Sequence, residues 1–161
     1  MDIKQAIATI NHSIDQYSVV TDNLPRELLT WKPDADKWSI MEVLCHVEEA
    51  IDYWLGEVNN LAQSPGTEWG RGLQHPGRLA AVANAGNRSF DEVLNRIQAS
   101  KLAVESTLNG LSEQQLNTEA PSRNPRFGTK PMSFIIEHLM VEHLNTHIKQ
   151  IQRNITEYPS A

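Results

Sequence analysis

The stretch PMSFIIEHLMVEHLNTHIKQIQRN, residues 131–154, decides the fold class of this chain. Its apolar residues recur every three or four positions, which is the spacing of one face of an α-helix. Pro131 favours the first position of such a helix, and the pattern continues to about Asn154. We therefore predict a long amphipathic helix that buries one of its faces.

Three earlier stretches have the same helical pattern. Ser39 and Glu42 have the spacing of a capping box at a helix start, and Ser89 and Glu92 repeat it further along the chain. No β-branched alternation persists for the length of a strand, so strand signals are weak throughout. The sequence thus predicts an all-α fold, a four-helix bundle. The first predicted helix carries its apolar stripe over residues 3–17 and ends near residues 23–25, where Pro25 disfavours a helix. The other predicted helices span about 39–55, 89–110 and 131–154.

Two of the predicted connections are long. Residues 62–88 join the second and third helices, and residues 111–130 join the third and fourth. The first connection is long enough to cross the bundle, so successive helices need not alternate in direction. Its glycines lack the Gly-Lys-Ser/Thr ending of a phosphate-binding loop. At 161 residues, the chain is expected to form a single domain over residues 1–161.

The composition excludes several classes of partner. The chain carries 14 basic and 20 acidic residues, a formal charge of −6, and has no basic cluster for nucleic acid. No apolar run approaches the roughly 18 residues of a membrane span, and no signal-peptide core follows Met1. Cys45 is the sole cysteine, which excludes an intrachain disulfide. We expect a cytoplasmic protein with neither nucleic-acid nor membrane partners.

Histidines mark the last predicted helix. At about 100° per residue, His143 and His147 share its apolar face, while His138 lies roughly 140° from His143 and is expected at the periphery. His12 and His75 are expected to be exposed. Burying an imidazole costs free energy unless its nitrogens are hydrogen-bonded or bound to metal. The pair of buried histidines leaves two interpretations open, a metal site or packing in the core.

The second predicted helix offers a third ligand. His46 lies on its core-facing side, whereas Cys45 points about 100° away to the polar side. Glu42 and Glu49 flank His46 by about one turn. Glu42 is interpreted as a helix cap and Glu49 as a solvated residue, and each is also a candidate acceptor for an imidazole N–H. Three imidazoles can hold a divalent ion with a position left open, as in catalytic zinc sites. Imidazole also suits nickel, copper and iron, so the metal stays unidentified.

At these residues the sequence resembles the DinB/YfiT-like superfamily of small four-helix bundle proteins. The resemblance rests on WKPDADKWSIMEVLCHVEEA (31–50), SFDEVLNRIQASKLAVESTLNGLSEQQL (89–116) and EHLNTHIKQI (142–151), which together cover most of the chain. The family pattern is a Trp-Ser start of the second helix, a later His, and a final His pair followed by Gln-Ile. In this chain the matching positions are Trp38, Ser39, His46, His143, His147, Gln150 and Ile151.

The resemblance implies one divalent ion, such as zinc, nickel or iron, held by His46, His143 and His147. Gln150 and Glu49 are the candidates to orient the ligands. It further implies an enzyme that transfers a low-molecular-weight thiol to an electrophile, with a thiolate or water activated at the metal. The alternatives are a metal-dependent hydrolase and a non-catalytic metal-binding bundle in stress response.

Similarity to the family also predicts a homodimer. One departure lies just before Gln150, where relatives often carry Arg-Gly and this chain has Ile148 and Lys149. The three histidines are unaffected by this departure, which changes the two residues that follow His147.

Overall fold

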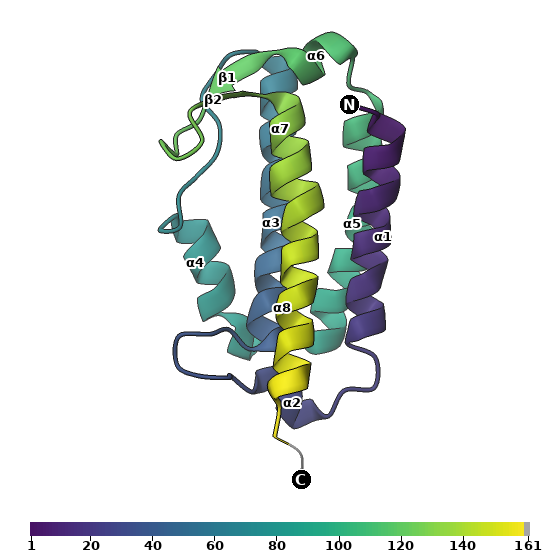
Figure 1. Ribbon diagram of the computed structural model, residues 1–161, viewed down its shortest axis with the longest axis vertical. Helices are drawn as coiled ribbons and strands as arrows, with labels where there is room; N and C mark the ends of the chain where they lie inside the picture. Colours follow the sequence, from purple (N-terminus) through teal and green to yellow (C-terminus); the bar gives the residue numbers. More distant parts are fainter. Residues whose placement is uncertain (160–161) are drawn as a thin grey trace.

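The structure is a computed structural model that describes residues 1–159, so residues 160–161 of the predicted domain lie outside the described residues. Four long helical segments form a bundle, which confirms the predicted fold class (Figure 1). They are α1 (Ile3–Val20), α3 (Ile40–Gln63), α5 (Phe90–Asn109) and a last helix made of α7 (Met132–Ile136), the π-helical segment η2 (Glu137–Glu142) and α8 (His143–Glu157). The short elements are α2 (Arg26–Thr30), α4 (Pro76–Ala83), the 3₁₀ turn η1 (Ala85–Asn87), α6 (Glu113–Asn117), β1 (Glu119–Pro121) and β2 (Thr129–Pro131).

The order of the helices in the bundle differs from their order in the chain. Both α1 and α3 pack against α5 and against α8, so α1 and α3 lie at diagonal positions. In Figure 1, α1 and α8 run downward and α3 and α5 run upward. Because α3 has 24 residues and rises about 36 Å, the chain needs a long return before α5 can begin beside it. The connection predicted to cross the bundle does so, and it contains α4.

Side-chain caps set several helix ends. Ser39 Oγ accepts from Glu42 N at 3.1 Å, and a Glu42 carboxylate oxygen accepts from Ser39 N at 2.9 Å, which confirms the predicted capping box. Ser89 caps α5 through Glu92 N. Pro131, predicted as the first helical residue, instead precedes α7 as its N-cap because it still belongs to β2. None of the helices in residues 1–159 has the length and hydropathy that crossing a membrane requires.

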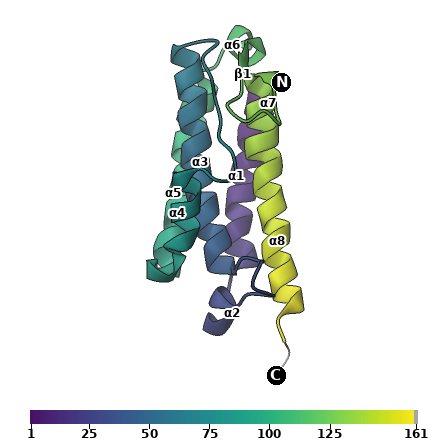
Figure 2. The same cartoon turned by 90° about the vertical axis from the view of Figure 1, so that its left-hand side faces the viewer.

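The second long helix was predicted too short. α3 continues past Leu55 to Gln63, because Val58 and Leu61 extend its buried face by two further turns. The first helix, expected to end near residues 23–25, ends slightly earlier, at Val20. The extra length takes α3 to the end of the bundle at which β1 and α6 lie (Figure 2).

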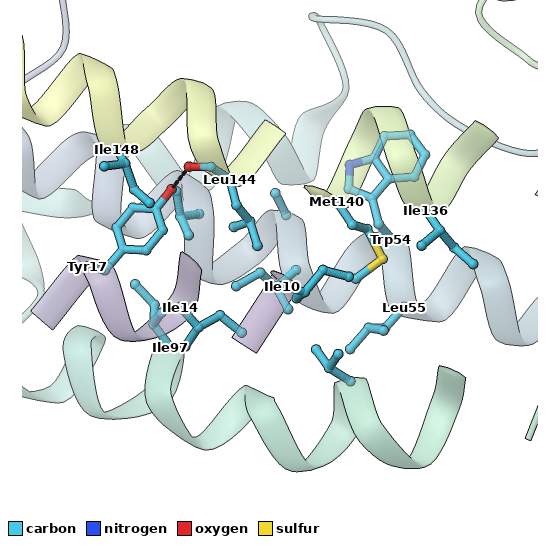
Figure 3. Close-up of a cluster of buried hydrophobic side chains, with 14 of the residues drawn as sticks. Ile10, Ile14, Tyr17, Trp54, Leu55, Ile97, Ile136, Met140, Leu144 and Ile148 are labelled. Atoms are coloured by element: carbon cyan, nitrogen blue, oxygen red, sulfur yellow. Dashed lines mark hydrogen bonds between the residues drawn. The ribbon is translucent and has the colours of Figure 1, made fainter. Parts of the chain in front are cut away.

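The apolar faces of the four long helices meet in one core, part of which is shown in Figure 3. Ile10, Ile14 and Tyr17 of α1 are fully buried there. The Tyr17 hydroxyl donates to the Leu144 carbonyl oxygen at 2.6 Å, which links α1 to α8 close to the histidine pair (Figure 3). The core therefore fixes the rotation of α8 about its own axis.

A small β-ribbon, which was not predicted, lies at one end of the bundle (Figure 1). β1 and β2 pair antiparallel over three residues each, too short for an alternating pattern to appear. Trp69 of the long connection joins the ribbon: its backbone N–H donates to the Pro121 carbonyl at 3.1 Å and its indole Nε1 to the Ala120 carbonyl at 2.8 Å. The long connection and the ribbon consequently form one packed unit.

A buried carboxylate fastens this unit to α3. Glu57 is only 6% exposed and accepts hydrogen bonds from the Tyr53 hydroxyl at 2.8 Å and the Gly70 N–H at 2.7 Å. Arg123, which follows β1, donates to the same carboxylate oxygen at 3.1 Å. Gly70 has φ +87°, a conformation that favours glycine. These bonds set the path of the chain into residues 71–78.

Candidate metal centre

Three imidazoles meet between α3 and α8. His143 Nε2 lies 2.8 Å from His147 Nε2 and 3.2 Å from His46 Nε2. The ligand atoms of the three residues all lie within 4.8 Å of one another. His46 and His147 are buried and His143 is half-buried. The structure thus brings together the three histidines that the sequence singled out.

The spacing of these nitrogens fits a bound ion. A tetrahedral zinc ion with Zn–N distances of about 2.0–2.1 Å holds its nitrogen ligands roughly 3.3 Å apart. The separation between His46 and His143 matches this value, and the separation between His143 and His147 is somewhat shorter. Only small movements of the side chains would place all three nitrogens around one ion.

Hydrogen bonds alone do not satisfy the cluster. His147 Nδ1 lies 2.7 Å from Gln150 Oε1, an acceptor, so the His147 proton sits on Nδ1 and Nε2 presents a lone pair. When His143 is neutral, its Nε2 carries at most one hydrogen. That hydrogen can bond to His46 Nε2 or to His147 Nε2, but not fully to both. His46 Nδ1 is buried and has no hydrogen-bond partner among residues 1–159. The three Nε2 atoms therefore face one another with too few hydrogens to link them, and this arrangement fits a divalent ion better than it fits ordinary core packing.

The environment keeps all three rings neutral, as metal ligation requires. Burial, with smaller contributions from the charges of His147 and His143, lowers the pKa of His46 to about 2. Burial also lowers the pKa of His143 to about 3, with the charges of His147 and Arg78 adding to the effect. The pKa of His147 is lowered by burial as well, although its bond to Gln150 opposes the shift. Neutral imidazoles are therefore available well below pH 7.

The two candidate orienting residues take different positions. Gln150 contacts the cluster directly through His147. Glu49 contacts none of the three histidines; its carboxylate instead binds the guanidinium of Arg71 at 2.5 and 2.6 Å. The arginine outcompetes an imidazole for Glu49 because it offers two charged N–H groups in a fork that matches the carboxylate. Glu42 belongs to the capping box of α3, as expected.

Cys45 is not on the polar side of its helix, so that expectation was wrong. The side chain is 1% exposed, because α3 is covered by α4 and α5 as well as by α8. Burial raises the pKa of the thiol to about 11, which makes a thiolate unfavourable at neutral pH. Cys45 does not belong to the histidine cluster.

The other histidines fall into three situations. His12 is exposed, as predicted. His75, also expected to be exposed, is half-buried: its Nδ1 accepts from Gly77 N at 3.2 Å and its ring packs on Tyr53. His138 is peripheral, with its side chain 40% exposed and paired to Glu142. These three side chains are outside the cluster.

The π-helical segment changes the position of His138. A π-turn closes i→i+5 hydrogen bonds, so it contains more residues per turn and rotates each by a smaller angle than an α-turn. The α-helical count of 140° between His138 and His143 was therefore too large. His138 instead lies at the rim of the same cavity as His143.

A tryptophan closes the cluster on one side. The Trp38 ring lies 5.0 Å from the His46 ring and stacks on His147 at 6.2 Å, centroid to centroid. The fully buried Asn154 donates to the Trp38 carbonyl at 2.8 Å, which holds the preceding loop against α8. Trp38 thus covers the rings of His46 and His147.

A cavity of about 720 Å³ opens beside the cluster. His46 and His143 form part of its wall, and α4, the long connection and the loop between β1 and β2 form much of the rest. Sequence analysis missed the residues that shape it, although Pro76 before an apolar stretch is a helix-start signal for α4. The other lining residues are Trp54, Arg71, Gly72, Leu73, Gln74, Arg78, Asn124, Arg126, Phe127, His138, Leu139, Glu142 and Thr146.

The sequence profile of the DinB superfamily matches residues 10–151, which include all three histidines. The chain belongs to the DinB superfamily. This confirms the resemblance stated from the sequence motifs. None of the curated proteins matches this DinB chain.

Solved structures share its fold at low sequence identity. YfiT from Bacillus subtilis, described as a probable metal-dependent hydrolase with an unusual four-helix bundle topology, superposes with a TM-score of 0.81 at 13% identity, covering 96% of this chain and 86% of YfiT. A protein from Streptococcus pneumoniae has a TM-score of 0.70 at 13% identity, covering 99% of this chain and 93% of its own. A mycothiol-dependent maleylpyruvate isomerase has a TM-score of 0.65 at 14% identity, covering 100% of this chain and 62% of the isomerase.

Replacing Gln150 is expected to weaken metal binding in this DinB protein. Without its Oε1, His147 loses the acceptor that holds its tautomer and ring orientation. We expect Gln150→Ala to lower the affinity for a divalent ion by roughly 10- to 100-fold, measured by competition with a chelator. The matched control is Gln152→Ala, two residues along α8 and exposed, which should bind like the wild type. Equal affinities in the two variants would contradict the role of Gln150.

The metal-free protein is expected to lose stability on acidification. The folded-state pKa values of His46, His143 and His147 lie below their ordinary value of 6.5, so below that pH the unfolded chain binds more protons. The free energy of unfolding therefore falls as pH drops below about 6.5, by up to about 1.4 kcal/mol per pH unit for each histidine. Urea denaturation with chelator between pH 7 and 5 measures this slope. His46→Gln should reduce it and the exposed His12→Gln should not; a flat profile in the wild type would refute the expectation.

Proposed function

We propose that this DinB protein is a metal-dependent enzyme that transfers a low-molecular-weight thiol to an electrophilic small molecule. The observation that carries the proposal is a three-histidine cluster in the wall of a cavity, with no further ligating side chain in the cluster among residues 1–159. Structural zinc sites fill four positions with protein ligands, whereas catalytic sites keep one open. A divalent ion held there would supply an open position at which a thiol or a water loses its proton near neutral pH.

The residues around the cluster prepare it for this chemistry. Burial keeps the imidazoles unprotonated, so their lone pairs stay available. Trp38 packs on the ring of His147, Asn154 holds the backbone of Trp38, and Trp54 gives the cavity an apolar wall. Excluding water strengthens electrostatic interactions and protects a thiolate from competing reactions.

The lining of the cavity favours a thiol over water as the attacking group. A water must lose a second proton during hydrolysis, and the leaving group must gain one, so a general acid–base residue is normally placed at the reacting atoms. Glu142 is the one carboxylate among the lining residues, and it pairs with His138 at 2.8 Å on the exposed rim. A thiol needs to lose only one proton before it attacks. Thiol transfer therefore does not need the free carboxylate that is missing among the lining residues.

Hydrolysis is the second candidate, and the likeness to YfiT, described as a probable metal-dependent hydrolase, favours it. The likeness to the mycothiol-dependent isomerase supports thiol chemistry instead. The two reactions use the same histidines. Assays with different substrates can therefore distinguish them, whereas the metal site alone cannot.

A conjugation assay tests the proposal. Metal-loaded protein is incubated with 1-chloro-2,4-dinitrobenzene and, in turn, glutathione, bacillithiol and mycothiol. The sulfur forms a bond to the ring carbon, chloride leaves with the bonding electron pair, and the thiol proton passes to solvent. We expect conjugation above the uncatalysed rate with at least one thiol, lost in His143→Ala. Ester cleavage without conjugation would establish the hydrolase, and neither activity would indicate a non-catalytic bundle.

A further inference from the structure

The charge of the cavity is opposite to that of the chain. The protein as a whole carries −6, yet three of its eight arginines line the cavity beside the histidine cluster. These are Arg71, Arg78 and Arg126, and Glu142 is the one acidic residue among the lining side chains. A cavity with excess positive charge attracts and retains anions.

Arg71 does not account for the excess. Its side chain is 4% exposed, lies over the Tyr53 ring at 3.9 Å, and forms a two-pronged ion pair with Glu49. This pair is complete in itself, because both carboxylate oxygens of Glu49 are bound. Arg71 therefore has a structural role in the wall of the cavity.

Arg78 has no such partner. Its guanidinium donates to the Leu73 carbonyl oxygen at 3.0 Å, and within residues 1–159 it forms no ion pair. The side chain is half-buried, and burial together with the charge of Arg71 lowers its pKa. The nearby carboxylate of Glu49 is already bound to Arg71. Glu49 binds only Arg71, so the charge of Arg78 is left uncompensated in the wall of the cavity.

Arg78 also lies next to the metal centre. Its guanidinium carbon is 5.4 Å from the centre of the Trp38 ring, and that ring packs on His46 and His147. Arg78, His46 and His143 line the same cavity. Glu142, on the last helix, is hydrogen-bonded to His138 at the rim of the cavity. An anionic group of a bound molecule would therefore meet Arg78 close to the cluster.

We propose that Arg78 binds a carboxylate group of the small molecule that enters this cavity, so that the protein selects carboxylate-bearing ligands over neutral ones. The inference rests on the proposed function, because the ligand is the thiol or its electrophilic partner. A guanidinium matches a carboxylate with two parallel N–H groups, which gives orientation as well as affinity. Arg126 adds positive charge at the exposed edge, where an anion would enter.

Paired probes test this proposal. Zinc-loaded protein is titrated calorimetrically with 3-mercaptopropionate and with 3-mercaptopropionamide, which share a thiol and differ in the carboxylate. We expect the wild type to bind the acid about ten-fold more tightly than the amide or better, equivalent to 1.4 kcal/mol. Arg78→Gln should bind the two probes equally. The control, Arg96→Gln, removes an arginine of α5 that is 66% exposed and outside the cavity, and should keep the preference.

Two results would overturn the role of Arg78. One is equal binding of acid and amide by the wild type, and the other is an unchanged preference in Arg78→Gln. Zinc content is measured in every sample. A wild-type protein that takes up no zinc refutes the metal-dependent function itself, whereas full zinc content without a preference for the acid refutes only the assignment of Arg78.

Discussion

The His143→Ala variant is expected to purify without a stoichiometric divalent ion, whereas the wild type should carry close to one ion per chain. His143 Nε2 is the nitrogen that contacts both of the others, at 2.8 and 3.2 Å. Its removal leaves two imidazoles and no neighbouring side chain in the cluster to replace it. Because losing even an outer partner of a ligand costs roughly 10- to 100-fold in affinity, we expect the loss of a ligand to exceed about 100-fold. Elemental analysis after metal loading measures the result.

His138→Ala is the matched control for this prediction. His138 lies on the same helix and lines the same cavity, but its ring pairs with Glu142 and is not a member of the cluster. The variant should retain full metal content. His147→Ala should lose it, as His143→Ala does. Metal retained in both ligand variants would contradict the assignment of the site.

Trp69→Ala is expected to destabilise the protein by about 3–5 kcal/mol, the range for removing a large buried aromatic side chain. Trp69 is 0% exposed and packs against Trp54, Phe127 and Phe134. Its indole N–H also donates to the Ala120 carbonyl, which would be left without that partner. The same substitution removes the support behind two walls of the cavity, because Trp54 and Phe127 line it.

Chemical denaturation of the two proteins measures this difference. The control is Leu102→Ala on α5, whose side chain is 75% exposed and which should change the free energy of unfolding by no more than about 0.5 kcal/mol. A loss below about 1 kcal/mol for Trp69→Ala would show that the long connection is not held by this residue.

Much of the bundle could be predicted from local sequence. Ser39 and Glu42 act within one helical turn, so their capping box is visible in four consecutive residues. The periodic apolar stripes of α1 and of the last helix show which face is buried. The same count placed His143 and His147 inward, and the structure brings His46 beside them.

Features that depend on contacts between distant segments were not predictable. The helical count put Cys45 on a polar side because it cannot show that α3 is covered on several sides. The π-helical segment has no sequence signature, so the position of His138 relative to His143 was misjudged. Arg71 and Arg78 belong to the long connection between α3 and α5, which the sequence pattern indicated to be a loop. The contacts of these arginines depend on the packing of α4 against α3.

Glu49 shows the same limit in a single residue. It lies about one turn from His46 along α3, so a contact with the imidazole was a reasonable hypothesis. Arg71 is 22 residues further along the chain, and its two-pronged bond to Glu49 exists only in the folded structure. Local spacing gives candidates for such a contact, and tertiary packing selects among them.

The most direct test of the central claim, an open metal site made by three histidines, is X-ray absorption spectroscopy of the zinc-loaded protein with and without a bound thiol. Without thiol, the spectrum should show imidazole neighbours from three residues and no sulfur. After addition of 3-mercaptopropionate, a sulfur neighbour of zinc should appear. A fourth protein ligand that keeps the spectrum unchanged when thiol is added would contradict the claim.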